Sequence, residues 1–254
     1  MEKVNKTIEL LPVHVHDTRA ESGAAAAAEA AGIIRDAIAR NGCANVIFAA
    51  APSQNDLLES LLQQDIDWSK VRGFHQDEYI GLPAEHPAGF GNFLRRAIFE
   101  RVPFLELHYM ACKPEDAEAM CEQYSALLEK YPPDLIFLGV GENGHLAFND
   151  PAVADFHDPK RVKIVDLDPV CRMQQVNDGC FASVEEVPHR ALTLTMSQIL
   201  SVPRAVAVVP TVRKAAAIAA ALKGPISESC PASILRRCQG ASLYLDADSA
   251  SQAF

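Results

Sequence analysis

The chain has 254 residues, of which 49% are hydrophobic and 22% charged, and its net charge is −10. This length and composition predict one globular domain, residues 1–254, with a substantial core. The acidic balance argues against a nucleic-acid partner, because neutralising phosphates requires a basic face. No run of about 18 apolar residues is present that could cross a membrane.

The first residues and the cysteines bear on the compartment. The start MEKVNKTIELL mixes acidic and basic residues and lacks the layout of a secretory signal peptide, so we expect cytoplasmic residence. The seven cysteines are scattered, odd in number and form no CxxC pair. That pattern predicts neither a disulfide framework nor a zinc site.

Strand patterns and helix patterns alternate along the chain. Such alternation predicts an α/β fold with a doubly wound, mostly parallel sheet and helices on both faces. In chain order the expected elements are a strand at Ile8–His14, a helix at Ala20–Arg40 that Gly42 ends, a strand at Asn45–Ala51, a helix at Gln54–Gln64, a strand ending near Val71–Phe74, a helix at Glu115–Tyr131, strands at Asp134–Val140, Arg161–Val165 and Ala205–Val209, a helix at Lys214–Leu222 and a strand at Ser242–Leu245.

The segment GVGENGHLAFND, Gly139–Asp150, directly follows the apolar run DLIFL. Ligands bind in open α/β sheets where the carboxyl ends of the strands open into loops. Gly139 and Gly141 would let backbone amides approach such a ligand closely, and His145 could move protons near neutral pH. The plainer interpretation is a strand-to-loop turn that holds one satisfied histidine, because a glycine-rich loop alone is weak evidence.

A second polar segment, FHQDEYIGL, follows the strand that ends near Phe74. It places Asp77, Glu78 and Tyr79 side by side at the end of a strand. Taken alone, three such side chains in a row more often form a solvated loop than a site.

Together the two segments resemble the glucosamine-6-phosphate deaminase (isomerase) family. The family signatures, MDEY-GLP and G-x-G-x-(D/N)-G-H-(I/L)-A-F-N-E-P, stand here as QDEYIGLP, Gln76–Pro83, and GVGENGHLAFNDP, Gly139–Pro151. The resemblance continues in HPAGFGNFLRRAIFERV (His86–Val102), which looks like a family helix, in VPHRALTLT (Val187–Thr195) and in PASIL (Pro231–Leu235). It extends from about Ile8 to the C-terminus and implies a Rossmann-like fold.

This resemblance implies an enzyme that converts glucosamine 6-phosphate, or a related hexosamine phosphate, to a ketose phosphate and ammonia. The reaction needs ring opening, proton transfer between C1 and C2, and loss of the amine. None of these steps requires a redox centre, so we expect no cofactor and no metal. The implied partner is a small-molecule sugar phosphate. Family members differ in their assembly, so a homo-oligomer stays open for this chain.

The resemblance also assigns the catalytic residues. Asp77 matches the aspartate that carries the proton between C1 and C2, and His145 matches the histidine that acts on the ring oxygen. Two positions depart from the common pattern. Asn143 stands where aspartate is frequent, and Asp150 replaces a glutamate that is one methylene longer. Asn143 supplies no charge to the imidazole, so we expect these changes to affect the efficiency of ring opening.

The phosphate end resembles the family least. The family's Gly-Gly-Thr-Pro type loop is AAAPSQND here, without glycine. Ser53 with the nearby helix N-terminus could bind an anion, or Ser53 could be an ordinary N-cap. Lys214 matches the phosphate-binding lysine, the alternative being a solvated lysine at a helix start, and Arg172 is the nearest candidate for the family's arginine. The residues expected to bind substrate are Ser53, Gln54, Glu78, Gly139, Gly141, Arg172 and Lys214.

Two other functions fit the pattern less well. 6-Phosphogluconolactonases share the fold, but their segments usually read DER and GDGH-T-A-S-L-F-P, and LAFND after His145 favours the deaminase. A non-catalytic sugar-phosphate sensor would carry a DNA-binding segment, for which this chain has no room. Such a sensor would also be expected to lose Asp77 or His145, and both are present.

Overall fold

The computed structural model describes residues 2–83 and 85–254. Its centre is an eight-stranded sheet of order β1-β2-β11-β10-β7-β3-β4-β6. All neighbouring strands are parallel except the pair β1 and β2. The strands are β1 (Glu2–Ile8), β2 (Leu11–His16), β3 (Ala44–Phe48), β4 (Val71–His75), β6 (Glu106–Leu107), β7 (Leu135–Leu138), β10 (Ala205–Val209) and β11 (Ala241–Asp246).

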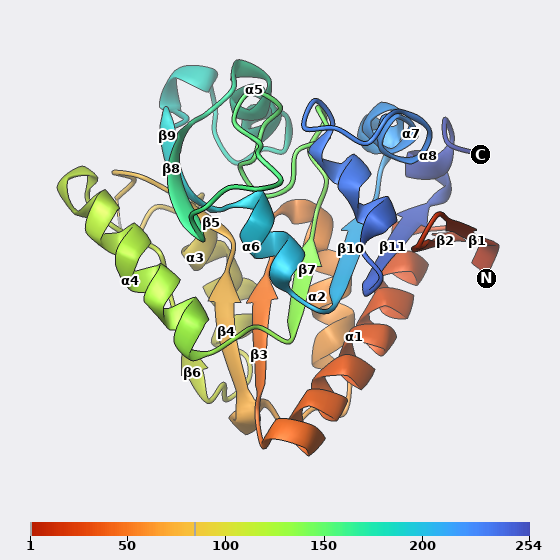
Figure 1. Cartoon of the computed structure of the whole chain (residues 1–254), viewed down its shortest axis with the longest axis horizontal. Helices are drawn as coiled ribbons and strands as arrows, with labels where there is room; N and C mark the ends of the chain where they lie inside the picture. Colours follow the sequence, from red (N-terminus) through yellow and green to blue (C-terminus); the bar gives the residue numbers. More distant parts are fainter. Residues whose placement is uncertain (1, 84) are drawn as a thin grey trace.

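Helices cover both faces of this sheet (Figure 1). Successive side chains of a strand point to opposite faces, so Phe48 of β3 packs in one apolar cluster and Ile47 in the other. The predicted doubly wound α/β fold is therefore confirmed. Helices α1 (Arg19–Asn41), α2 (Asn55–Leu62) and α3 (Phe90–Leu94), which continues as a π-helical segment (Arg95–Phe99), share the cluster of Phe48; α4 (Ala117–Lys130), α6 (Met196–Ser201), α7 (Ala215–Lys223) and α8 (Ala247–Ala250) share the cluster of Ile47.

A second, antiparallel sheet lies above the strand ends of the main sheet in Figure 1. Its order is β5 (Asp77–Tyr79), β9 (Arg190–Leu194), β8 (Val162–Asp166), and α5 (Pro169–Asn177) follows β8. The strand predicted at Arg161–Val165 thus exists, shifted by one residue, but it belongs to this small sheet. Only Val162 and Val165 of this strand are buried, so it is more exposed than the fully buried strands β3, β7 and β10 of the main sheet.

The strand expected at Ile8–His14 exists as β2, Leu11–His16, but the strand before it was missed. β1 (Glu2–Ile8) precedes β2, and the two form a hairpin whose turn is at Glu9–Leu10, so that Ile8 pairs with Leu11. Glu9 takes a φ of 55° in that turn, a conformation that Asn, Asp or Gly usually supplies, so no turn signal was visible in the sequence. The helix expected at His86–Val102 begins only at Phe90. The other predicted elements have ends within three residues of the observed ones.

The order of the strands creates a crevice between β3 and β7. From β3 the chain proceeds to β4 and β6 on one side, and from β7 to β10 and β11 on the other. At such a switch point the loops leave in opposite directions, and ligands bind outside the carboxyl ends of the strands. The segments that leave β3 and β7 here are residues 49–54 and 139–145. The topology therefore brings the loop that carries His145 next to the alanine-rich turn that carries Ser53.

Helix α1 supports the loop after β3 through close contact with α2. Thr18 accepts the amide of Glu21 at 3.2 Å as N-cap, and Gly42 ends the helix with a φ of 79°, as predicted. A Cβ on Gly23 would lie 2.8 Å from the backbone of Asp56 and Leu57.

No helix in the described part of the chain is both long and apolar enough to span a bilayer.

Gly23→Ala should destabilise the protein by about 1–3 kcal/mol, because overpacking forces the two helices apart. Gly32→Ala in the same helix is the matched control, since nothing lies within 4 Å of its added Cβ, and it should stabilise by up to about 1 kcal/mol. Urea unfolding of the three proteins measures both effects. Equal effects of the two substitutions would contradict the close contact.

Candidate active site

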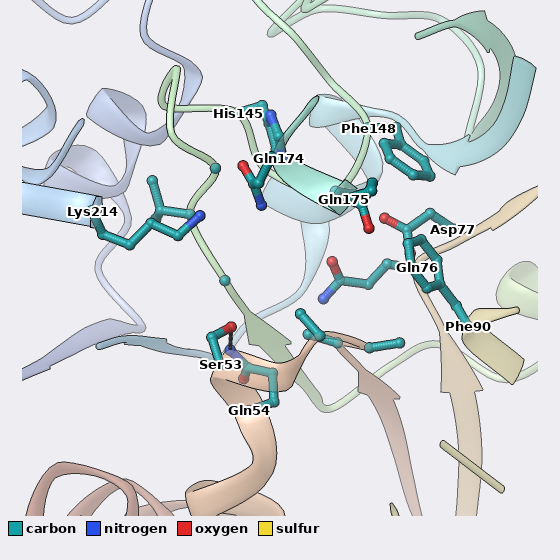
Figure 2. A pocket seen from close by; sticks show the side chains of 17 residues that line it. Ser53, Gln54, Gln76, Asp77, Phe90, His145, Phe148, Gln174, Gln175 and Lys214 are labelled. Carbon is teal, nitrogen blue, oxygen red and sulfur yellow. Dashed lines mark hydrogen bonds between the residues drawn. The ribbon is translucent and has the colours of Figure 1, made fainter. Parts of the chain in front are cut away.

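A pocket opens at the carboxyl ends of β3, β4, β7 and β10 (Figure 2). Figure 2 shows Lys214 entering it from one side and Asp77 from the opposite side, with His145 above and Ser53 below. The pocket brings together seven of the predicted site residues: Ser53, Gln54, Asp77, Gly139, Gly141, His145 and Lys214. These residues come from four separate segments of the chain, so only the folded sheet makes them neighbours.

His145 is held by a buried carboxylate behind it. Its Nδ1 lies 2.9 Å from Oδ1 of Asp150, which is 1% exposed. Asn143 donates from Nδ2 to the same carboxylate at 2.8 Å and accepts the backbone amide of His145 at 3.2 Å. Burial opposes the charge of Asp150, but the close imidazole of His145 and the hydrogen bond from Asn143 outweigh it and lower the pKa of Asp150. Asp150 therefore stays anionic beside the imidazole.

The loop geometry explains the spacing of its glycines. A Cβ on Gly141 would lie 2.2 Å from the imidazole of His145, so only glycine lets the ring pack there. Gly144 has a φ of 84° and donates to the carbonyl of Gly141 at 3.0 Å. Asn149, fully buried, donates to the carbonyls of Leu146 and Leu194 at 3.0 and 2.8 Å. The motif thus fixes the direction of the imidazole.

Asp77 lies on β5, opposite Thr193 of β9. Its side chain is buried against the pocket and only 7% exposed. Burial, together with the charge of Glu78, raises the pKa of Asp77 well above its usual value. No described residue forms an ion pair with this carboxylate. A carboxyl group in such a setting can exchange protons near neutral pH.

Two predicted binding residues lie outside the pocket. Glu78 is buried and accepts the amides of Phe90 and Gly91 at 3.0 and 2.8 Å, so it holds the first turn of α3. Arg172 donates to the carbonyls of Val184 and Val187 at 2.6 and 2.9 Å. Both side chains therefore support neighbouring backbone in this structure instead of facing the pocket.

Lys214 and Ser53, two of the residues expected to bind the phosphate, both line the pocket. Lys214, 6% exposed, forms no ion pair with any described residue, and burial lowers its pKa despite the nearby acids. This excludes a solvated lysine. Ser53 is not an N-cap either, because Ala51 occupies that position in the 3-10 turn Pro52–Gln54. The hydroxyl of Ser53 instead accepts from Nε2 of Gln54 at 3.2 Å beside the pocket.

Sequence reasoning missed three amide side chains and two aromatic rings of the pocket: Gln76, Gln174, Gln175, Phe90 and Phe148. Gln174 accepts the amide of Glu142 at 2.9 Å and so ties α5 to the loop after β7. The amide of Gln175 points into the pocket (Figure 2) and bonds to no described residue. A signal was present: Cys171, Gln174 and Gln175 have the spacing of one helix face, and all three are buried.

Comparisons with known proteins agree with this geometry. Residues 17–244 match the family described as glucosamine-6-phosphate isomerases/6-phosphogluconolactonase. The glucosamine-6-phosphate deaminase of Streptococcus pneumoniae serotype 4 is 30% identical over 86% of this chain and 91% of its own. A solved monomeric glucosamine-6-phosphate deaminase matches with a TM-score of 0.86 and 27% identity, over 94% of this chain and 99% of that one. A 6-phosphogluconolactonase from Trypanosoma brucei, 18% identical, matches with a TM-score of 0.77 over 99% of this chain and 100% of that one and so shares the fold.

The raised pKa of Asp77 predicts a stability effect. A carboxyl group whose folded pKa is raised stabilises the protein only at low pH, and that stability is lost as the pH rises through the folded pKa. Asp77→Asn should therefore melt at a higher temperature than the original protein at pH 7. The difference should be about 2–4 °C for each kcal/mol by which the substitution raises the free energy of unfolding. Near pH 4 the two melting temperatures should converge.

Thermal melts of both proteins between pH 4 and pH 8 measure this difference. Groups remote from Asp77 are the same in the two proteins, so the change of the gap with pH reports on Asp77 and its immediate neighbours. A gap that does not depend on pH would show that the carboxylate is not penalised by burial.

Proposed function

The chain belongs to the glucosamine-6-phosphate isomerase/6-phosphogluconolactonase family, and from this premise we propose that it is an amino-sugar phosphate isomerase-deaminase. Its substrate is glucosamine 6-phosphate or a related hexosamine phosphate, and its products are the ketose phosphate and ammonia. One observation carries the proposal: Asp77 and His145, a buried carboxyl group and an imidazole backed by Asp150, face one pocket with Lys214 across it.

His145 serves ring opening. It gives a proton to the ring oxygen as the bond between that oxygen and C1 breaks, while the C1 hydroxyl loses its proton and becomes the aldehyde. Asp150 holds the imidazole through Nδ1, and Asn143 keeps the carboxylate in place. This division of work is the same as in other sites where an imidazole is oriented by a carboxylate.

Asp77 serves the proton transfer between carbons. As a base it removes the proton from C2, and the aldehyde oxygen takes back the proton that the C1 hydroxyl lost on ring opening, which gives an enol with the amine still on C2. It then returns the proton to C1, which produces an iminium group at C2. Water adds to C2 and ammonia leaves, so the ketose phosphate forms. Burial suits Asp77 to this work because a base with a raised pKa can also return its proton.

Lys214 and Ser53 hold the phosphate. Lys214 is the one cationic side chain among the described residues that line the pocket, and Ser53 adds a hydroxyl. A lysine kept from other ion pairs binds a phosphate as a point charge. In this arrangement the phosphate lies at the Lys214 end of the pocket and C1 and C2 lie toward Asp77.

The test is ammonia release from purified hexosamine 6-phosphates, with the ketose phosphate followed in parallel. We expect release from at least one hexosamine phosphate. Asp77→Asn should lower kcat by about 10²–10⁴-fold, the usual contribution of a general acid–base group, and so should His145→Gln. Sugar-phosphate binding by Asp77→Asn, measured by calorimetry, should persist.

6-Phosphogluconolactone belongs in the same panel, because solved lactonases share the fold. Hydrolysis of a lactone requires no base at C2, so Asp77→Asn would retain it. Lactone hydrolysis without ammonia release from any amino sugar would overturn the proposed reaction.

The role of Lys214 can be tested separately. Lys214→Ala should raise KM for the phosphorylated sugar with a much smaller change in kcat, because the phosphate is held alike in the ground state and the transition state. Lys223→Ala is the matched control, since this exposed lysine ends the same helix and bonds to the carbonyl of Gln252 at 2.9 Å. An unchanged KM for Lys214→Ala would remove Lys214 from the phosphate site.

A further inference from the structure

One buried nucleophile beside the site has no part in the proposed reaction. Cys171 lies in the first turn of α5, and its side chain is 1% exposed. Its sulfur and one donor atom each from His145 and Asp150 lie within 4.8 Å of one another. The cluster therefore combines a thiol, an imidazole and a carboxylate from two segments of the chain.

The donor set is that of a transition-metal site. Zinc accepts sulfur, imidazole nitrogen and carboxylate oxygen at about 2.0–2.3 Å, so tetrahedral ligand atoms lie about 3.3–3.8 Å apart. Nδ1 of His145 is buried and, although 2.9 Å from Asp150, is not aligned with it as a hydrogen bond. A buried ring nitrogen that makes no aligned hydrogen bond can serve as a ligand atom, and the neighbouring carboxylate of Asp150 would join it as a second ligand. The 4.8 Å limit exceeds this spacing by about 1.0–1.5 Å, so side-chain movements of about an ångström would complete a three-ligand site.

We propose that His145, Asp150 and Cys171 bind Zn²⁺ or another thiophilic divalent cation, and that the bound ion inhibits the enzyme. The thiol of Cys171 loses its proton to solvent when the metal–sulfur bond forms. The ion takes the ring nitrogen that faces Asp150 and the carboxylate itself, so the imidazole can no longer exchange protons under the control of that carboxylate. The site is regulatory and supplies nothing to the reaction.

Metal binding is tested on the metal-free protein with Co²⁺ as a spectroscopic substitute for Zn²⁺. The unaltered protein should show a thiolate-to-cobalt charge-transfer band that saturates at a single ion per chain and that Zn²⁺ displaces. Removing even an outer partner of a metal ligand costs 10–100-fold in affinity, so Cys171→Ala should weaken binding at least about tenfold and abolish the band. Cys121→Ala, at a buried cysteine of α4, is the matched control and should keep it.

A band that persists in Cys171→Ala, or one that disappears in Cys121→Ala, would overturn the proposed site. Cys171→Ser is the second variant if the alanine protein fails to fold. The second experiment, on inhibition, rests on the proposed function. Zn²⁺ should inhibit ammonia release reversibly, and Cys171→Ala should require an at least about tenfold higher Zn²⁺ concentration for the same inhibition. If the protein releases no ammonia, the cobalt spectra still decide the metal site, so the two failures are distinguishable.

Discussion

The parallel pairing of β3 with β7 is the contact on which the site depends. Val46 lies opposite Leu135 and Ile47 opposite Ile136, and this pair joins the two halves of the sheet at the point where the winding reverses. The loops that leave the two strands diverge and open the crevice between them. A different neighbour for β3 would separate Ser53 from His145 by at least one strand spacing, about 4.8 Å.

Two charged side chains of the pocket, Asp77 and Lys214, are buried at the positions where the proposed reaction needs them. Asp77 and Lys214 are both buried without an ion pair to any described residue, and burial moves their pKa values in opposite directions, up for the carboxyl group and down for the ammonium group. Elsewhere buried charge is compensated: Asp150 has His145 and Asn143, and Glu78 accepts three backbone amides. Perturbed groups that lack such partners and line a cleft are typical of functional sites.

Amides, not further cations, line most of the polar surface of the pocket. Gln54 and Gln76 donate to the carbonyls of Val208 and Phe137 on neighbouring strands, which ties the pocket wall to the main sheet. Gln174 and Gln175 come from α5, on the opposite side. The pocket thus combines the single cation Lys214, among the described residues that line it, with four neutral amide side chains.

The sequence by itself determined the alternation of strands and helices and the two loops that carry Asp77 and His145. These features are local: the apolar pattern selects the faces of each element, Gly141 is required by the close approach of His145 in its own loop, and Gly144 by its φ of 84°. The tertiary structure decided which polar side chains meet. Glu78 binds the backbone of α3, Arg172 binds carbonyl groups that follow α5, and the side chain of Gln175 faces the pocket. The positions of α5 and of the small sheet depend on pairings between residues far apart in the chain. No local pattern encodes such pairings, so the sequence could not predict these contacts.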